Sequence, residues 1–164
     1  PRWSLSPNKF HHMFAGEWID RGLEGWAAPG LAEKRPDLSF SKVVDEPCEP
    51  FGDEVQLIPL KCIPFTNEVV LFHRPSRSLV VTDLVINLPK DAPALTRAAF
   101  FTSGAYPGCK ASFLERMVMK RELARTEIRG LLDLDLERLI PGHGSIIETG
   151  AKDALRDAYR WLGV

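Results

Sequence analysis

Two apolar runs, Val69-Val70-Leu71-Phe72 and Leu79-Val80-Val81-Thr82, lie on either side of the segment Arg74-Pro75-Ser76-Arg77. Their β-branched residues favour strands and the proline presets a turn angle, so this stretch predicts a β-hairpin with a four-residue loop. Both runs are continuously apolar rather than alternating, which is typical of strands covered on both faces. The chain must therefore build layers on each side of this hairpin.

Other patterns predict strands before the hairpin and mainly helices after it. Alternation over 54–58 predicts a half-buried strand, and 42–44 predicts a short one. Helical spacing predicts a helix over 13–24, and the capping box of Ser112 and Glu115 begins another that extends to about Arg125. A short strand over 138–140 and a helix with its apolar face at Ala151, Ala154, Leu155, Ala158 and Leu162 complete the chain. We expect a single α/β domain over residues 1–164.

Composition narrows the class of partner. The formal net charge is -1, with 21 basic and 22 acidic residues, so we expect no nucleic acid and no membrane partner, and a small-molecule substrate remains. Cys48, Cys62 and Cys109 are widely spaced and odd in number, which predicts reduced thiols in a cytoplasmic protein. The sequence begins at Pro1, so a targeting segment ahead of it stays open.

Four features carry residues suited to metal chemistry. His11-His12 offers two imidazoles, Asp83 follows the second hairpin strand, Glu68 opens the first, and His143 lies between two glycines in Pro141-Gly142-His143-Gly144. Each has a plainer interpretation. The histidine pair is a surface feature, Asp83 caps a turn, Glu68 pairs with an arginine of the hairpin loop, and the glycines form a simple turn.

Taken in order, these residues resemble the metallo-β-lactamase-like superfamily. In that superfamily an H-x-H-x-D-H loop is followed by a lone histidine, a bridging aspartate at the end of a strand, and a final histidine often found in P-G-H-G. Within it, the chain is similar to a branch classed as a domain of unknown function. That similarity is carried by Pro7-Asn8-Lys9-Phe10-His11-His12, Asn67-Glu68-Val69-Val70 and Phe72-His73-Arg74-Pro75-Ser76-Arg77.

The resemblance implies an αβ/βα sandwich and a metal site. His12 matches the last histidine of the first loop, Asp83 the bridging carboxylate and His143 the final ligand. The chain departs from the pattern elsewhere: Pro7 and Lys9 stand at the first two histidines, His11 at the aspartate and Glu68 at the lone histidine. Since the His-x-His pair that anchors the first zinc is missing, a two-zinc hydrolase is not expected.

The remaining set predicts a metal site at His11, His12, Glu68, Asp83 and His143, holding zinc, iron or manganese, or no metal. The implied function is a metal-dependent hydrolase in which Asp83 and Glu68 are the catalytic carboxylates. Two alternatives stay open: a catalytically silent binding or scaffold protein, and an iron-dependent redox protein. The superfamily fold usually begins well before its first metal loop. We therefore expect N-terminal strands to be missing from this chain, with self-association as one consequence.

Overall fold

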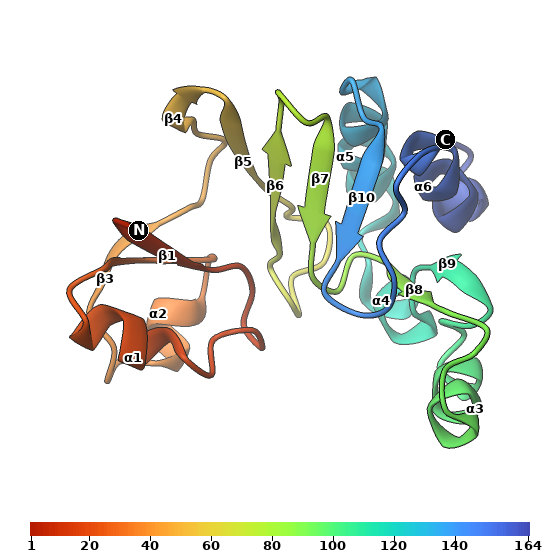
Figure 1. The fold of residues 1–164 in the computed structure, drawn as a ribbon, viewed down its shortest axis with the longest axis horizontal. Helices are drawn as coiled ribbons and strands as arrows, with labels where there is room; N and C mark the ends of the chain where they lie inside the picture. Colours follow the sequence, from red (N-terminus) through yellow and green to blue (C-terminus); the bar gives the residue numbers. More distant parts are fainter.

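A computed structural model describes all 164 residues (Figure 1). The strands are β1 (Trp3–Ser6), β2 (Glu24–Ala27), β3 (Phe40–Val43), β4 (Pro50–Asp53), β5 (Val55–Pro59), β6 (Val69–His73), β7 (Ser78–Val81), β8 (Ile86–Leu88), β9 (Gly108–Lys110) and β10 (Arg138–Pro141). The helices are α1 (Ala15–Asp20), α2 (Leu31–Lys34), α3 (Ala94–Thr102), α4 (Phe113–Val118), α5 (Arg121–Asp133) and α6 (Ala151–Tyr159), which is followed by a 3₁₀ turn at Arg160–Leu162.

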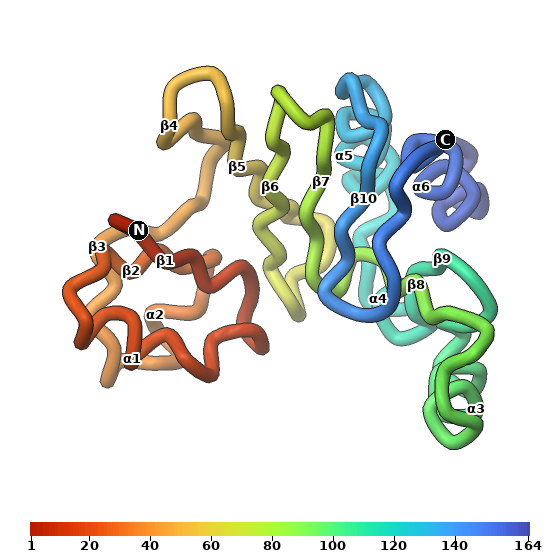
Figure 2. The backbone as a smooth tube through the Cα atoms, in the orientation of Figure 1, coloured from red at the N-terminus to blue at the C-terminus, as the bar shows by residue number.

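A central four-stranded sheet has the order β10-β7-β6-β5. The hairpin strands β6 and β7 are antiparallel, and β10 pairs parallel to β7. The N-terminal third of the chain forms a separate parallel sheet, β1-β2-β3, with α1 and α2. Figure 2 shows the backbone passing from this N-terminal unit through the central sheet to α6, so the two termini lie on opposite sides of that sheet.

The main core lies between the central sheet and α5 and α6. It contains 22 buried residues, among them Val70, Leu79 and Leu139 of the sheet and Ile128 and Leu155 of the helices. A smaller cluster of Ala28, Val44, Leu57 and Val69 joins the N-terminal unit to β5 and β6. Apolar layers on both sides of the hairpin explain its continuous apolar runs.

Most predicted elements are confirmed, with two differences in helix bounds. The hairpin, the strand over 54–58, the strand at 138–140 and the C-terminal helix form as expected. The helix predicted over 13–24 ends at Asp20, because Gly22 has a φ of 87° and the chain turns there into β2. The predicted helix from 113 to about 125 is broken between α4 and α5, where Met119 turns into the core and the Lys120 amide donates to the carbonyl of Cys62.

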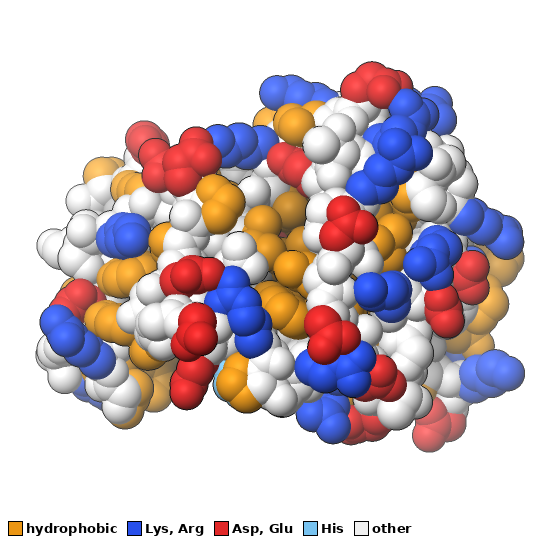
Figure 3. Space-filling model, turned by 90° about the horizontal axis from the view of Figure 1, so that it is seen from above, with side chains coloured by type: hydrophobic (Ala, Val, Ile, Leu, Met, Phe, Trp, Pro, Cys, Tyr) orange, Lys and Arg blue, Asp and Glu red, His pale blue; other side chains and the backbone are white.

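Two features of the structure concern the expected partners: the charge of the surface, and the length and hydropathy of the helices. On the face seen in Figure 3, basic and acidic side chains are interspersed, so that face presents no extended area of one sign. None of the helices is both long and apolar enough to span a membrane. The three cysteines are unpaired.

Candidate metal centre

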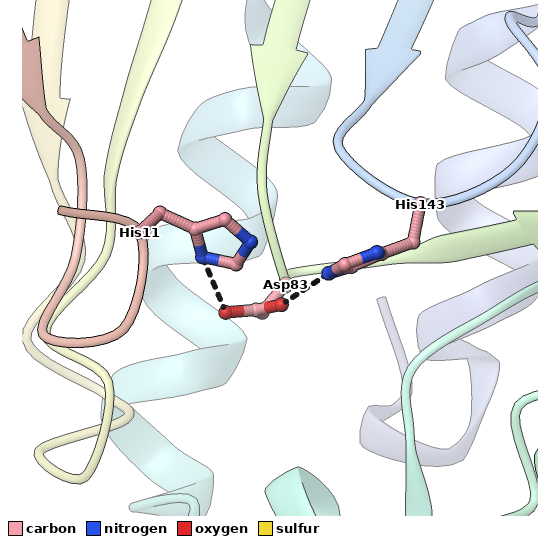
Figure 4. A group of neighbouring side chains, drawn as sticks. All are labelled: His11, Asp83 and His143. Carbon is pink, nitrogen blue, oxygen red and sulfur yellow. Dashed lines mark ion pairs between the residues drawn. The ribbon is translucent and has the colours of Figure 1, made fainter. Parts of the chain in front are cut away.

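Three side chains from distant parts of the sequence meet at one end of the central sheet (Figure 4). Asp83 lies between two histidines: His11 Nδ1 is 3.3 Å from Asp83 Oδ2, and His143 Nε2 is 3.2 Å from Asp83 Oδ1. The two imidazole centres are 5.3 Å apart. One nitrogen or oxygen of each residue lies within 4.8 Å of the others, so the three could hold a single metal ion.

Strand direction brings Asp83 and His143 together. Because β7 and β10 are parallel and Val81 pairs with Pro141, both strands end at the same edge of the sheet, the lower edge in Figure 1. Asp83 and His143 each follow their strand by two residues, so both side chains reach that edge. Ligands of open α/β sheets bind at such carboxyl ends.

The glycines beside His143 are required by close backbone contacts. A Cβ on Gly144 would lie 2.0 Å from the carbonyl oxygen of Asn87, and its φ is 100°. A Cβ on Gly142 would lie 3.2 Å from the Cα of Thr82. The turn thus packs against the chain on two sides, which fixes the backbone that carries His143.

Glu68 is completely buried and accepts three backbone hydrogen bonds. Its Oε1 accepts from the Thr82 amide at 2.6 Å, and its Oε2 accepts from the amides of Asp83 and Leu84 at 2.9 Å each. Burial raises the pKa of Glu68 to about 7, although the hydrogen bonds from the amides favour the ionised form. Both oxygens serve the turn after β7, so Glu68 holds the backbone of Asp83.

Asn8 links His11 to Asp83. Its Nδ2 donates to Thr82 Oγ1 at 2.8 Å and to Asp83 Oδ2 at 2.7 Å. Its Oδ1 accepts from the His11 amide at 2.8 Å and lies 3.1 Å from His11 Nδ1. Asn8 is fully buried, so its amide group fixes the orientation of both side chains.

The structure therefore brings together three of the five predicted ligands. His12, although adjacent to His11, turns away, and its Nδ1 lies 3.0 Å from Arg35 Nη1. Glu68 lies outside the group because its oxygens accept from backbone amides. The sequence interpretation missed Asn8. An asparagine that begins a turn after a proline is a weak signal, and its partners lie 74 and 75 residues away.

A cavity of about 600 Å³ adjoins the three side chains and gives access to them. Its apolar lining is Phe10, Phe65, Ile86, Leu114, Met117 and Val118, and its polar lining is His11, Thr66, Asp83, Ser112, Glu115 and His143. Glu115 is only 7% exposed, and its Oε1 has no hydrogen-bond partner. Burial, and then the nearby carboxylates of Glu68 and Asp83, raise the pKa of Glu115 to about 8.

The overall fold, a layered α/β arrangement of sheets and helices, is that of the metallo-β-lactamases. The DIM-1 metallo-β-lactamase aligns with a TM-score of 0.63 and 12% identity, covering 98% of this chain and 69% of that one. FIM-1 from Pseudomonas aeruginosa, in a mono-zinc form, gives a TM-score of 0.58 and 10% identity over 99% and 68%. A chemotaxis sensor, ODP, solved as a peroxy diiron species, gives 0.61 and 12% over 96% and 68%.

Within that fold, the sequence matches the family described as "Domain of unknown function (DUF4336)" over residues 30–127. Since the match spans more than half of the chain, the protein belongs to this family. No curated protein sequence matches the chain. Both expectations from the sequence, the superfamily fold and the branch of unknown function, are confirmed.

Replacing Asn8 with alanine should weaken metal binding at His11, Asp83 and His143 by roughly 10- to 100-fold, because His11 and Asp83 lose the amide group that orients them. The dissociation constant is measured by competition with a chromophoric chelator. Asn8→Leu is the comparison of similar size: it removes the donor to Asp83 and the acceptor for the His11 amide without opening a cavity, so it should weaken binding as much as Asn8→Ala. Equal affinity in all three proteins would show that Asn8 does not orient the site.

Proposed function

We propose that the protein is a metal-dependent hydrolase that holds one divalent cation, zinc in the first instance, at His11, Asp83 and His143. The observation that carries this proposal is the convergence of two imidazoles and one carboxylate in the lining of a cavity. Neutral imidazole nitrogen and carboxylate oxygen are usual zinc ligands, and three protein ligands leave room for water or substrate. The mono-zinc form of FIM-1 supports a single-metal site on this fold.

The chain's own residues would hold the cation and fix one another's orientation. Asp83 presents one oxygen toward each histidine, so its position decides the geometry of the whole group. Glu68 and Asn8 keep it there through buried hydrogen bonds. When bound, the cation supplies Lewis-acid chemistry: it polarises a carbonyl or phosphoryl oxygen and lowers the pKa of a water molecule.

The adjacent histidines give the sharpest test. His11→Ala and the double variant Asp83→Ala/His143→Ala should lose bound metal, whereas His12→Ala should keep it, because His12 contacts Arg35 instead of the group. Elemental analysis of protein purified without added metal gives the content per chain, expected to be near one equivalent in wild type. Hydrolysis of a panel of esters, amides and phosphoesters should stop with a chelator and return with zinc.

Three results would contradict the proposal in different ways. Protein that stays metal-free after incubation with excess zinc would favour a silent binding protein. Iron with a visible absorption band, and no hydrolysis, would favour redox chemistry, a second candidate supported by the similarity to the diiron sensor. If His12→Ala loses metal as fully as His11→Ala, the ligand set above is wrong.

A further inference from the structure

Helix α4 has an inverted distribution of polarity. It buries its one acidic residue, Glu115, and exposes Leu114 (68%), Met117 (66%) and Val118 (48%). The helix is held in this orientation at both ends: Ser112 Oγ accepts from the Glu115 amide at 3.2 Å, and Met119 enters the core immediately after the helix. A soluble protein rarely exposes such a row unless something binds to it.

The exposed side chains of α4 form one wall of the cavity at the candidate metal centre. Phe10 and Phe65, whose rings are 5.1 Å apart and which are 47% and 61% exposed, also line the cavity. Half of its lining residues are therefore apolar, and its ionisable lining groups are His11, Asp83, Glu115 and His143. Its volume of about 600 Å³ is within the range of small-molecule sites.

The charges of this cavity disfavour an anionic ligand. Its lining includes the carboxylate of Asp83 but no lysine or arginine. Lys34 comes near, with its Nζ 4.6 Å from the centre of the Phe10 ring, but it donates to the carbonyl oxygen of Lys9. Sites for phosphate esters normally supply arginine, lysine or several backbone amides to the phosphate.

We infer that the cavity binds a neutral molecule with an apolar body, an alkyl or aryl carboxylic ester or lactone, with the body against the apolar side chains of α4 and the Phe10–Phe65 pair and the carbonyl group at the histidines. The reaction in this inference rests on the proposed function, whereas the binding of the ligand does not. In the reaction, the bond between the carbonyl carbon and the alcohol oxygen breaks. Water supplies a hydroxyl group to that carbon and a proton to the alcohol.

Binding to metal-free protein tests the ligand class separately from catalysis. The probes are 2-butanone, 2-hexanone and 2-octanone, which keep a neutral carbonyl and cannot be hydrolysed, with octyl phosphate as the anionic comparison. Affinity, followed by saturation-transfer NMR, should rise about fourfold for each added methylene group. Octyl phosphate should bind at least about tenfold more weakly than 2-octanone, because it places a dianion beside the Asp83 carboxylate in a cavity whose lining has no lysine or arginine.

Variants locate the site. Leu114→Ser/Met117→Ser should weaken 2-octanone binding by about tenfold, since two apolar contacts are lost. Leu95→Ser, at an 84% exposed residue of α3 outside the cavity, should leave it unchanged. Circular dichroism checks that the variants are folded. Affinity independent of chain length, equal binding of octyl phosphate, or equal effects of the two variants would overturn the inference.

Three further outcomes separate this inference from its alternatives. If light scattering shows a dimer that Leu114→Ser/Met117→Ser converts to monomer, the apolar wall is a protein interface and the inference is wrong. If ketones bind as expected but the protein holds no metal and hydrolyses no ester, the inference on the ligand stands and the proposed function fails. If zinc is bound and only phosphoesters are hydrolysed, the proposed function stands and the inference fails.

Discussion

Replacing Glu68 with alanine is expected to lower the free energy of unfolding by about 3 to 5 kcal/mol, the largest effect of any single change at this site. Three buried amides, those of Thr82, Asp83 and Leu84, lose their acceptor at once, and the vacated space is closed to solvent because Glu68 has no exposed surface. Chemical denaturation of metal-free protein gives the free energy directly.

Glu127→Ala is the matched control. Glu127 also accepts from two backbone amides, those of Lys61 and Cys62, at 2.9 and 3.0 Å. It is partly exposed, so water can replace the carboxylate and the expected loss is only about 1 kcal/mol. Equal destabilisation by the two variants would mean that Glu68 does not hold the turn after β7 through its buried hydrogen bonds.

The second large effect is a loss of stability with rising pH caused by Glu115. Its pKa is raised to about 8 in the folded protein, by burial first and then by the carboxylates of Glu68 and Asp83. In the unfolded chain it titrates near pH 4.5. Between these two pKa values the folded state binds one more proton than the unfolded chain. The contribution of Glu115 to the free energy of unfolding is therefore fully present below about pH 4.5 and is lost as the pH rises toward 8.

Glu115→Gln removes this titration while keeping a side chain of the same shape. The variant should match wild type near pH 5 and exceed it by roughly a few kcal/mol near pH 8, measured on metal-free protein. Glu122→Gln, at a residue whose side chain is 83% exposed, should leave the pH dependence unchanged. A wild-type stability that is flat between pH 5 and 8 would contradict the account.

Local patterns predicted the parts of the fold that depend on nearby residues. The hairpin follows from two β-branched runs and a proline turn, and the start of α4 from Ser112 and Glu115, because each signal spans only a few residues. The break between α4 and α5 could not be predicted in this way. It depends on a contact between the Lys120 amide and Cys62, which lie far apart in the sequence.

The same distinction applies to the site. Asp83 and His143 were recognisable because each follows a strand. The parallel pairing of β7 and β10 then places both residues at the same edge of the sheet. The sequence could not separate His11 from His12, since the choice depends on Arg35 and Asn8. Nor could it show that Glu68 faces backbone amides, because strand alternation alone leaves its partners open.

His11, Asp83 and His143 belong to three segments that are far apart in the sequence: the N-terminal unit, the end of the hairpin and the turn after β10. An ion shared by these three would act as a cross-link in the folded protein, since the separated segments of an unfolded chain offer no such group. By mass action, occupancy at 100 times the dissociation constant would add about 2.7 kcal/mol to the stability of the fold. The N-terminal unit meets the central sheet through the cluster around Ala28 and Val44 and through the hydrogen bonds of Asn8, and such an ion would add one more link between the two.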